Sequence, residues 1–118
     1  MTDAHVHPAR RVRTPVPNDA LERAAAIFRA ASDVARLRLL HYLAEGEWCV
    51  SELAQASNVG MSTISQQLRL LRDARLVSRR RAGNHLYYSL ADDHIIKLIR
   101  NVIEHATEKP QKGRPDKK

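Results

Sequence analysis

Residues 49–76 constrain the fold more than any other part of the chain; they read CVSELAQASNVGMSTISQQLRLLRDARL. Apolar side chains recur at helical spacing on both sides of the tetrad at 58–61, which has the composition of a tight turn. Ser51 and Ser62 are expected to cap the two helices, and Gly60 is expected to adopt a positive φ in the turn. Two short helices joined in this way predict a helix-turn-helix motif. Its apolar positions are Leu53, Ala54, Ala56, Ile64, Leu68 and Leu71.

The segment before this motif predicts two further helices. The first begins at an N-cap that is Asn18 or Asp19, and the second begins after Ser32 or Asp33 and ends at Gly46. Apolar residues recur at helical spacing in both, at Leu21, Ala24, Ala25, Phe28, Val34, Leu37 and Leu40.

The segment after the motif predicts a hairpin and a last helix. Short β-favouring runs flank Gly83-Asn84, a dipeptide typical of hairpin turns, and indicate a two-stranded wing within residues 76–90. Residues 92–108 have an apolar stripe at helical spacing, formed by Ile95, Leu98, Ile99, Val102 and Ala106. The order of elements is that of a winged helix-turn-helix domain, a mostly α fold with a small β-hairpin.

The two ends of the chain differ from this central part in composition. Residues 1–18 contain three prolines and predict a flexible arm, residues 19–108 form the predicted domain, and residues 109–118 predict a disordered basic tail. No apolar run approaches the roughly 18 residues that cross a bilayer, so no membrane partner is expected. The single Cys49 favours a reducing, cytoplasmic location. No catalytic constellation appears, so neither an enzyme nor a small organic substrate is predicted.

Positive charge is concentrated beside the predicted motif. The formal net charge is +7, and residues 69–81 hold six arginines against one acid, Asp73. The outward face of the second helix offers hydroxyl, amide and guanidinium groups, which suit base edges and phosphates. A solvated surface helix is the alternative, but together with the wing the pattern predicts binding to double-stranded DNA. The predicted DNA-binding residues are Ser62, Thr63, Ser65, Gln66, Arg69, Arg72, Arg79, Arg80 and Arg81.

Metal-donor side chains lie at both ends of the last predicted helix. His94 and His105 are three turns apart on the same border of the apolar stripe, separated by about 16 Å of helix rise, so they cannot bind one ion within a single chain. If a second copy packs antiparallel, Asp92 and His94 of one chain meet His105 and Glu108 of the other, twice per dimer. Two imidazoles and two carboxylates suit four-coordinate zinc. The residues alone leave open a dimer helix with merely polar ends.

From about residue 21 to residue 108 the chain resembles the ArsR/SmtB family of bacterial metal-responsive repressors. The matching stretches are ASDVARLRLLHYL, EWCVSELAQ, STISQQLRLLRDARLVSRRRAGNHLYYSL and the closing D-x-H and H-x-x-E patterns at Asp92, His94, His105 and Glu108. The resemblance, closest to the zinc-sensing branch, implies a homodimer joined through its N- and C-terminal helices and released from operator DNA by zinc. Gln66 stands where family members often have His, which puts the operator preference in question.

The same resemblance suggests a second candidate metal site around Cys49. Glu52 stands three residues after it, and His5 and His7 could supply ligands from the arm. The arm contains no Cys, so a thiolate-rich site for a softer metal cannot be assembled. Two alternatives stay open: a nickel or cobalt sensor that recruits His5 or His7, and a winged-helix regulator without metal input that acts as a redox switch through Cys49.

Overall fold

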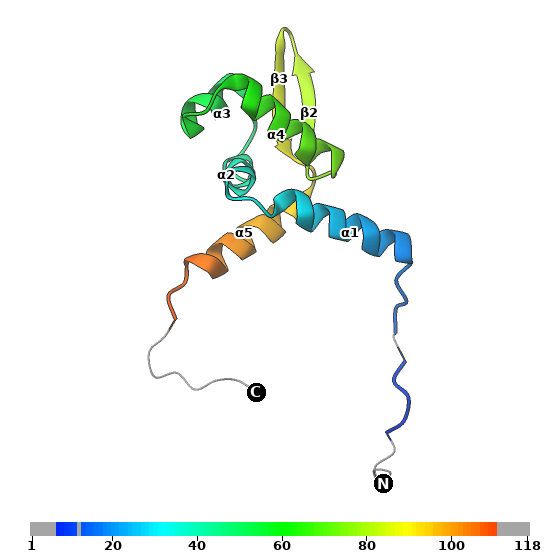
Figure 1. The fold of residues 1–118 in the computed structure, drawn as a ribbon. Coiled ribbons are helices and arrows are strands. Elements are labelled where there is room, and N and C mark those ends of the chain that lie inside the picture. The colour runs from blue at the N-terminus through cyan, green and yellow to red at the C-terminus, as the bar shows by residue number, and fades with distance from the viewer. Residues whose placement is uncertain (1–6, 12, 111–118) are drawn as a thin grey trace.

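The computed structural model of the chain describes residues 7–11 and 13–110. Five helices and a small sheet form the winged helix-turn-helix fold that the sequence predicts (Figure 1). The wing rises from one side of the molecule, and the first and last helices run along the opposite side. The elements in chain order are α1 (Asn18–Ala31), α2 (Val34–Leu43), β1 (Trp48–Cys49), α3 (Val50–Ser57), α4 (Met61–Asp73), β2 (Val77–Ala82), β3 (His85–Leu90) and α5 (Asp93–Thr107).

The start of α1 differs from the prediction, whereas the start of α2 is one of the two predicted. Pro17 occupies the N-cap of α1, and its carbonyl accepts hydrogen bonds from the amides of Ala20 and Leu21, at 3.1 and 3.2 Å. Asn18 and Asp19 therefore lie inside the helix, and the N-cap predicted at one of them is wrong. Proline is suited to a helix start because its φ is already fixed near the helical value. Asp33 caps α2 through its side chain.

The caps of the helix-turn-helix also lie elsewhere than predicted. α3 begins after Cys49, whose amide donates to the Glu52 carboxylate at 2.9 Å, so Ser51 is not the cap. The left-handed residue of the turn is Asn58, with a φ of 55°, whereas Gly60 has a φ of −62° and is itself the N-cap of α4. The predictions for Gly60 and Ser62 are therefore wrong. Asparagine tolerates left-handed backbone better than most residues, so the glycine was not needed there.

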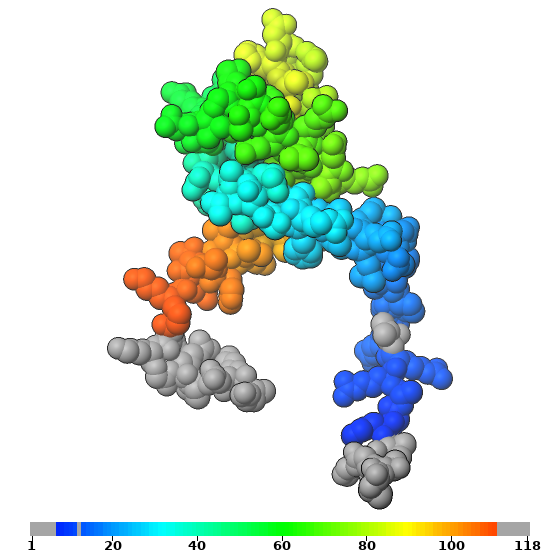
Figure 2. Space-filling model, viewed as in Figure 1, coloured from blue at the N-terminus to red at the C-terminus, as the bar shows by residue number. Residues whose placement is uncertain are grey.

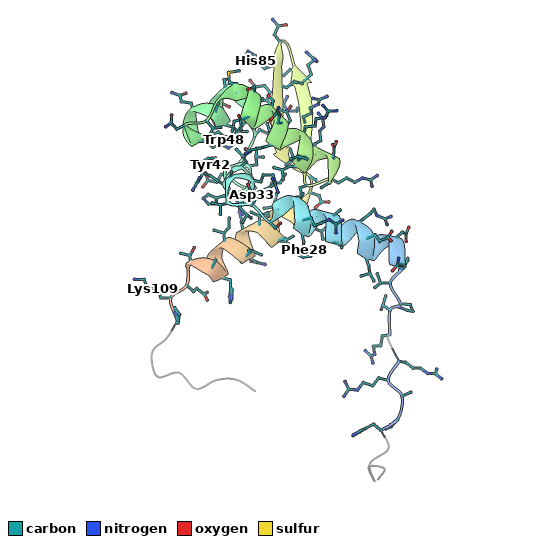
Figure 3. The ribbon with its side chains drawn as sticks, viewed as in Figure 1. Phe28, Asp33, Tyr42, Trp48, His85 and Lys109 are labelled. Carbon is teal, nitrogen blue, oxygen red and sulfur yellow. The ribbon has the colours of Figure 1, made fainter. Side chains whose placement is uncertain are left out.

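The sheet has a third strand that the hairpin prediction missed. Its order is β1-β3-β2, and all neighbours are antiparallel. β1 has only two residues, too few for a recognisable alternation, and Trp48 pairs with Tyr88 on β3. Trp48 also stacks on Tyr42 of α2 with ring centroids 5.3 Å apart (Figure 3), which supports a packing role for this tryptophan.

An aliphatic core joins the helix-turn-helix to α2, the wing and α5. Its fully buried side chains are Leu39, Leu40, Leu53, Ile64, Leu68, Leu71 and Leu76. The predicted apolar face of the second helix of the motif, which is α4, is thus confirmed. On other helices the prediction was less accurate, because Val34 is 71% exposed and Phe28 is 62% exposed. The apolar stripe of α5 is buried only at Ile95 and Ile99, and Val102 remains 47% exposed.

Candidate nucleic-acid interface and metal site

Helix α4 turns a polar face outward. Ser62, Thr63, Ser65, Gln66 and Arg69 are exposed, on the sides of the helix away from its buried residues. The N-terminus of the helix adds unpaired backbone N–H groups and the positive end of the helix dipole. This face therefore presents hydrogen-bond donors and acceptors beside positive charge, a combination suited to base edges and phosphates in a groove.

A shallow hollow between α4 and the wing gathers four of the predicted DNA-binding residues. Ser65, Arg69 and Arg72 line it from α4, and Arg79 lines it from β2. Val50, Leu86 and Tyr88 line it as well. Three arginines and a serine from two elements thus border one hollow, and their guanidinium and hydroxyl groups are suited to an anion such as a backbone phosphate.

The three wing arginines do not share one surface. Consecutive strand residues point to opposite faces, so Arg79 and Arg81 lie on one side of β2 and Arg80 lies on the other. Arg80 donates from Nε and Nη2 to the two carboxylate oxygens of Glu47, at 2.8 and 2.7 Å. Its guanidinium also lies 5.1 Å from the ring centre of Tyr87. Arg80 therefore differs in its surroundings from its two neighbours.

The Glu47–Arg80 pair perturbs both of its members. The hydrogen bonds from Arg80 hold the pKa of Glu47 below its ordinary value, and the same interaction raises the pKa of Arg80. The sequence interpretation missed Glu47 because no local pattern joins it to a residue 33 positions away. Only the strand order brings them together.

The four predicted zinc ligands occupy the two ends of α5. Asp92 is the N-cap, and its Oδ1 accepts a hydrogen bond from the amide of Ile95 at 3.0 Å. His94 follows it, with Nδ1 3.8 Å from Asp92 Oδ1, and its side chain is 96% exposed. His105 lies in the last turn and Glu108 is the C-cap, and both are exposed.

In a single protomer these four residues lie in two separate pairs, one at each end of α5. Among the residues that the structure describes, no group of three or more His, Cys, Asp or Glu side chains is arranged to hold a metal ion. The donor chemistry fits zinc, because two imidazoles and two carboxylates are ligands that zinc accepts in fourfold coordination. The geometry therefore fits zinc only if a second chain supplies the other pair.

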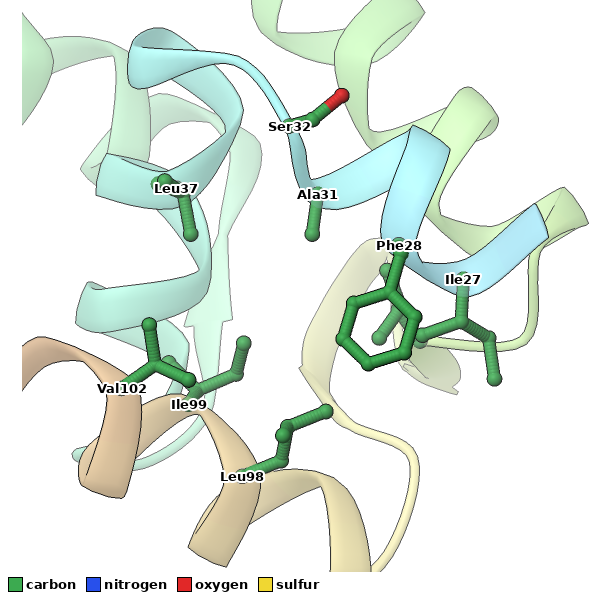
Figure 4. A pocket seen from close by; sticks show the side chains of 9 residues that line it. Ile27, Phe28, Ala31, Ser32, Leu37, Leu98, Ile99 and Val102 are labelled. Carbon is green, nitrogen blue, oxygen red and sulfur yellow. The ribbon is translucent and has the colours of Figure 1, made fainter. Parts of the chain in front are cut away.

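The surface that a second chain could cover lies between α1 and α5. An apolar hollow there is lined mostly by uncharged aliphatic and aromatic side chains, and the space-filling view is visibly indented between these helices (Figure 2, Figure 4). Phe28 and Val102 on its rim are exposed large hydrophobic residues. The lining residues are Ile27, Phe28, Ala31, Ser32, Leu37, Leu76, Leu98, Ile99 and Val102.

The second candidate metal site is only partly assembled in the described chain. Cys49 is half-buried, and its Sγ lies 3.2 Å from the hydroxyl oxygen of Ser51. The Glu52 carboxylate already accepts the capping hydrogen bond from the Cys49 amide, and this bond lowers the pKa of the carboxyl. His7 is exposed on the arm, and the prediction for His5 lies outside the described residues. Metal binding by Glu52 would therefore compete with capping of α3.

None of the described helices combines the length and the apolar character that a membrane crossing requires. The predicted arm at 1–18 and tail at 109–118 fall partly outside the described residues, so their flexibility stays a prediction.

Known proteins are similar to this chain in sequence and in fold. Residues 33–79 match the model of the bacterial regulatory protein arsR family. A transcriptional repressor SmtB homologue from Synechocystis is 45% identical over 105 residues, covering 88% of this chain and 80% of the relative. A homologue of the cadmium resistance transcriptional regulatory protein CadC from Staphylococcus aureus is 35% identical over 85 residues, covering 71% of this chain and 70% of the relative.

A solved structure extends the similarity to the whole fold. The homodimeric winged helix-turn-helix DNA-binding domain of a Mycobacterium bovis protein superposes with a TM-score of 0.72 and 30% identity, covering 80% of this chain and 90% of that one. The matched family model, the two regulators and this domain agree with the polar α4 face and the wing described above. The chain belongs to the ArsR/SmtB family of winged helix-turn-helix transcriptional repressors.

Proposed function

We propose that this repressor is a homodimer that binds operator DNA through α4 and the wing and releases it when zinc binds between the two α5 helices. The regulators it resembles are not enzymes, and neither is this chain. From α4, Ser62, Thr63, Ser65, Gln66, Arg69 and Arg72 would lie in two successive major grooves about one helical turn apart, and from the wing Arg79 and Arg81 would reach the neighbouring backbone. Because operator DNA lies in the cytoplasm of bacteria, the proposal includes a cytoplasmic location for this protein.

The proposed zinc site is shared by two chains. Asp92 and His94 of one protomer would join His105 and Glu108 of the other, and twofold symmetry would repeat the site at the opposite end. Bound zinc would supply a cross-link between the paired helices. Release from DNA requires that these ligands come together more favourably in the dimer arrangement that cannot span both half-sites than in the one that can.

One observation carries the proposal. Four exposed donor side chains occupy the two ends of a helix whose apolar side stays partly uncovered in a single protomer. Homodimerisation of the Mycobacterium bovis domain supports a covering chain, and the cadmium resistance regulator among the relatives supports a metal input.

A gel-shift titration with zinc tests the proposal. Wild type should leave DNA as zinc is added, and His105→Ala should stay bound at the same zinc concentrations. His41→Ala is the matched control, because it removes another exposed imidazole, on α2 and outside the proposed set. Equal release of wild type and His105→Ala would show that this site is not the sensor.

The same titration separates the rival sensors. A nickel or cobalt sensor that uses His5 and His7 would lose its response when residues 1–8 are deleted, whereas a zinc response at α5 would survive. A redox switch would ignore chelators and lose its response in Cys49→Ser. Retention of a zinc response in both variants supports the α5 site.

A further inference from the structure

The surroundings of Arg80 set it apart from every other arginine of the wing. Both carboxylate oxygens of Glu47 accept hydrogen bonds from the Arg80 guanidinium, at 2.7 and 2.8 Å, so the pair is bidentate. The ring of Tyr87 lies against the guanidinium, 5.1 Å from its carbon to the ring centre. Carboxylate and ring together fix the plane and the direction of the side chain, which a single monodentate contact would not do.

These three residues cross the whole sheet. Glu47 directly precedes β1, Tyr87 belongs to the central strand β3, and Arg80 belongs to β2. Tyr87 pairs with Cys49 of β1 on one side and with Arg80 of β2 on the other, so its strand lies between the two strands that the contact joins. The contact therefore ties the far strand of the wing to the segment that joins α2 to the sheet.

The pair is partly exposed, with 57% of the Arg80 side chain and 39% of the Glu47 side chain accessible, so it adds little to the stability of the domain. The pair acts instead on the orientation of β2. Arg79 lies on the opposite face of the same strand and lines the hollow shared with Arg69 and Arg72. A rotation of β2 would change the position of Arg79 relative to Arg69 and Arg72 of α4.

We infer that Arg80 is a positioning residue, which with Glu47 and Tyr87 fixes the wing so that Arg79 and Arg81 reach the DNA backbone, and that Arg80 itself contacts no phosphate. This inference rests on the proposed DNA binding. It reassigns one of the nine residues predicted from the sequence, and it gives Glu47, an acidic residue, a favourable role in binding a polyanion.

The salt dependence of binding distinguishes a positioning residue from a phosphate contact. The probe is a duplex that the wild-type protein selects from a random-sequence pool. Each lost phosphate contact lowers the magnitude of the slope of log K against log salt by about 1. Arg79→Gln, the matched control, should lose about 1 from the slope. Arg80→Gln should keep the wild-type slope, because Arg79 and Arg81 still form their contacts in the complex. It should weaken binding by about two- to fivefold, because a loosened wing has to be ordered on binding. A slope lowered by about 1 in Arg80→Gln would overturn the inference.

Glu47→Gln gives a test in which charge and position predict opposite signs. Removal of a negative charge near the DNA should tighten binding if charge alone matters. If Glu47 holds the wing, Glu47→Gln should weaken binding instead, and the exchanged pair Glu47→Arg with Arg80→Glu should recover most of the loss. Tighter binding by Glu47→Gln, or no recovery in the exchanged pair, would contradict the positioning role.

A readout without DNA separates this inference from the proposed function. Hydrogen exchange of the β2 amides in the free protein should accelerate in Glu47→Gln and Arg80→Gln, and not in Arg79→Gln. Unchanged exchange in all three variants overturns the inference even if the protein binds DNA. Failure of wild type to bind any duplex in the pool overturns the proposed function and this inference together.

Discussion

Single side chains at the helix starts show how local chemistry sets the pH response of the domain. Glu52 accepts a hydrogen bond from the Cys49 amide, and that bond lowers the pKa of the carboxyl. A carboxyl whose pKa is lower in the folded state stabilises the protein when ionised, so this contribution is present above the ordinary value of about 4.5 and is lost as the pH falls through the lowered pKa.

Glu52→Gln tests this sign. The variant should have a smaller free energy of unfolding than wild type at pH 7, and the difference should shrink as the pH falls below about 4.5. Urea unfolding at a series of pH values measures it. Glu45→Gln is the matched control, because Glu45 is exposed and forms no helix cap. A difference between wild type and Glu52→Gln that stays constant with pH would contradict the capping account.

Two leucines of one helix test the core at the residue scale. Leu68 is fully buried, so Leu68→Ala should lower the free energy of unfolding by about 2–5 kcal/mol. Leu70 lies two residues further on, about 200° around the helix from Leu68, and is 53% exposed. Leu70→Ala should therefore change the free energy of unfolding by no more than about 0.5 kcal/mol. Chemical denaturation measures both. Similar losses in the two variants would show that this face of α4 is not the core.

The periodicity of Ile64, Leu68 and Leu71 was enough to predict this buried face, because a helix fixes which residues share a side. The caps were harder to predict. Cys49 and Gly60 were not expected as caps, because Ser51 and Ser62 lie nearby and serine is a common N-cap. Which residue caps the helix depends on backbone angles that the amino-acid sequence does not specify. The turn shows the same limit, with left-handed backbone at Asn58 and not at Gly60, two residues later.

At the scale of elements, α4 combines a buried apolar face with an outward polar face suited to the recognition of bases. The outward Gln66 has an amide that can donate to and accept from one base edge, whereas an arginine such as Arg69 can also bind phosphates of any sequence. The wing needed the strand register before it could be interpreted. Three consecutive arginines look equivalent in the sequence, yet pairing with β3 sends Arg80 to the opposite face.

Gln66→Ala should therefore relax base preference at one position of each half-site. Discrimination at that position should fall by about 1–3 kcal/mol, and the salt slope should stay unchanged. Binding to operators with single base substitutions measures it. Gln55→Ala is the control, since Gln55 is an exposed amide on α3. Uniformly weaker binding to every operator would assign Gln66 to the backbone instead.

At the scale of the whole molecule, the uncovered apolar hollow between α1 and α5 indicates that one chain is half of the working unit (Figure 4). The sequence predicted the order of elements and an amphipathic last helix, but it predicted Leu21 and Phe28 as one apolar face without saying what covers them. Both are exposed in the single chain, and we expect a second molecule to cover them.

Val102→Glu should break the dimer. A carboxylate placed on the rim of this hollow would be buried without a partner in the assembled pair. Sedimentation equilibrium should find monomer for Val102→Glu and dimer for Val59→Glu, which places the same charge on the turn of the helix-turn-helix. A dimeric Val102→Glu would show that the chains associate through another surface.

Zinc binding by mixed dimers tests the central claim that each site takes ligands from two chains. Homodimers of His94→Ala or of His105→Ala have both sites damaged. A dimer of one His94→Ala chain and one His105→Ala chain keeps the intact His105 of the first and the intact His94 of the second, and both belong to the same site. The account predicts one zinc ion bound by the mixed dimer with wild-type affinity. Zinc binding by the mixed dimer no tighter than by either variant alone would contradict it.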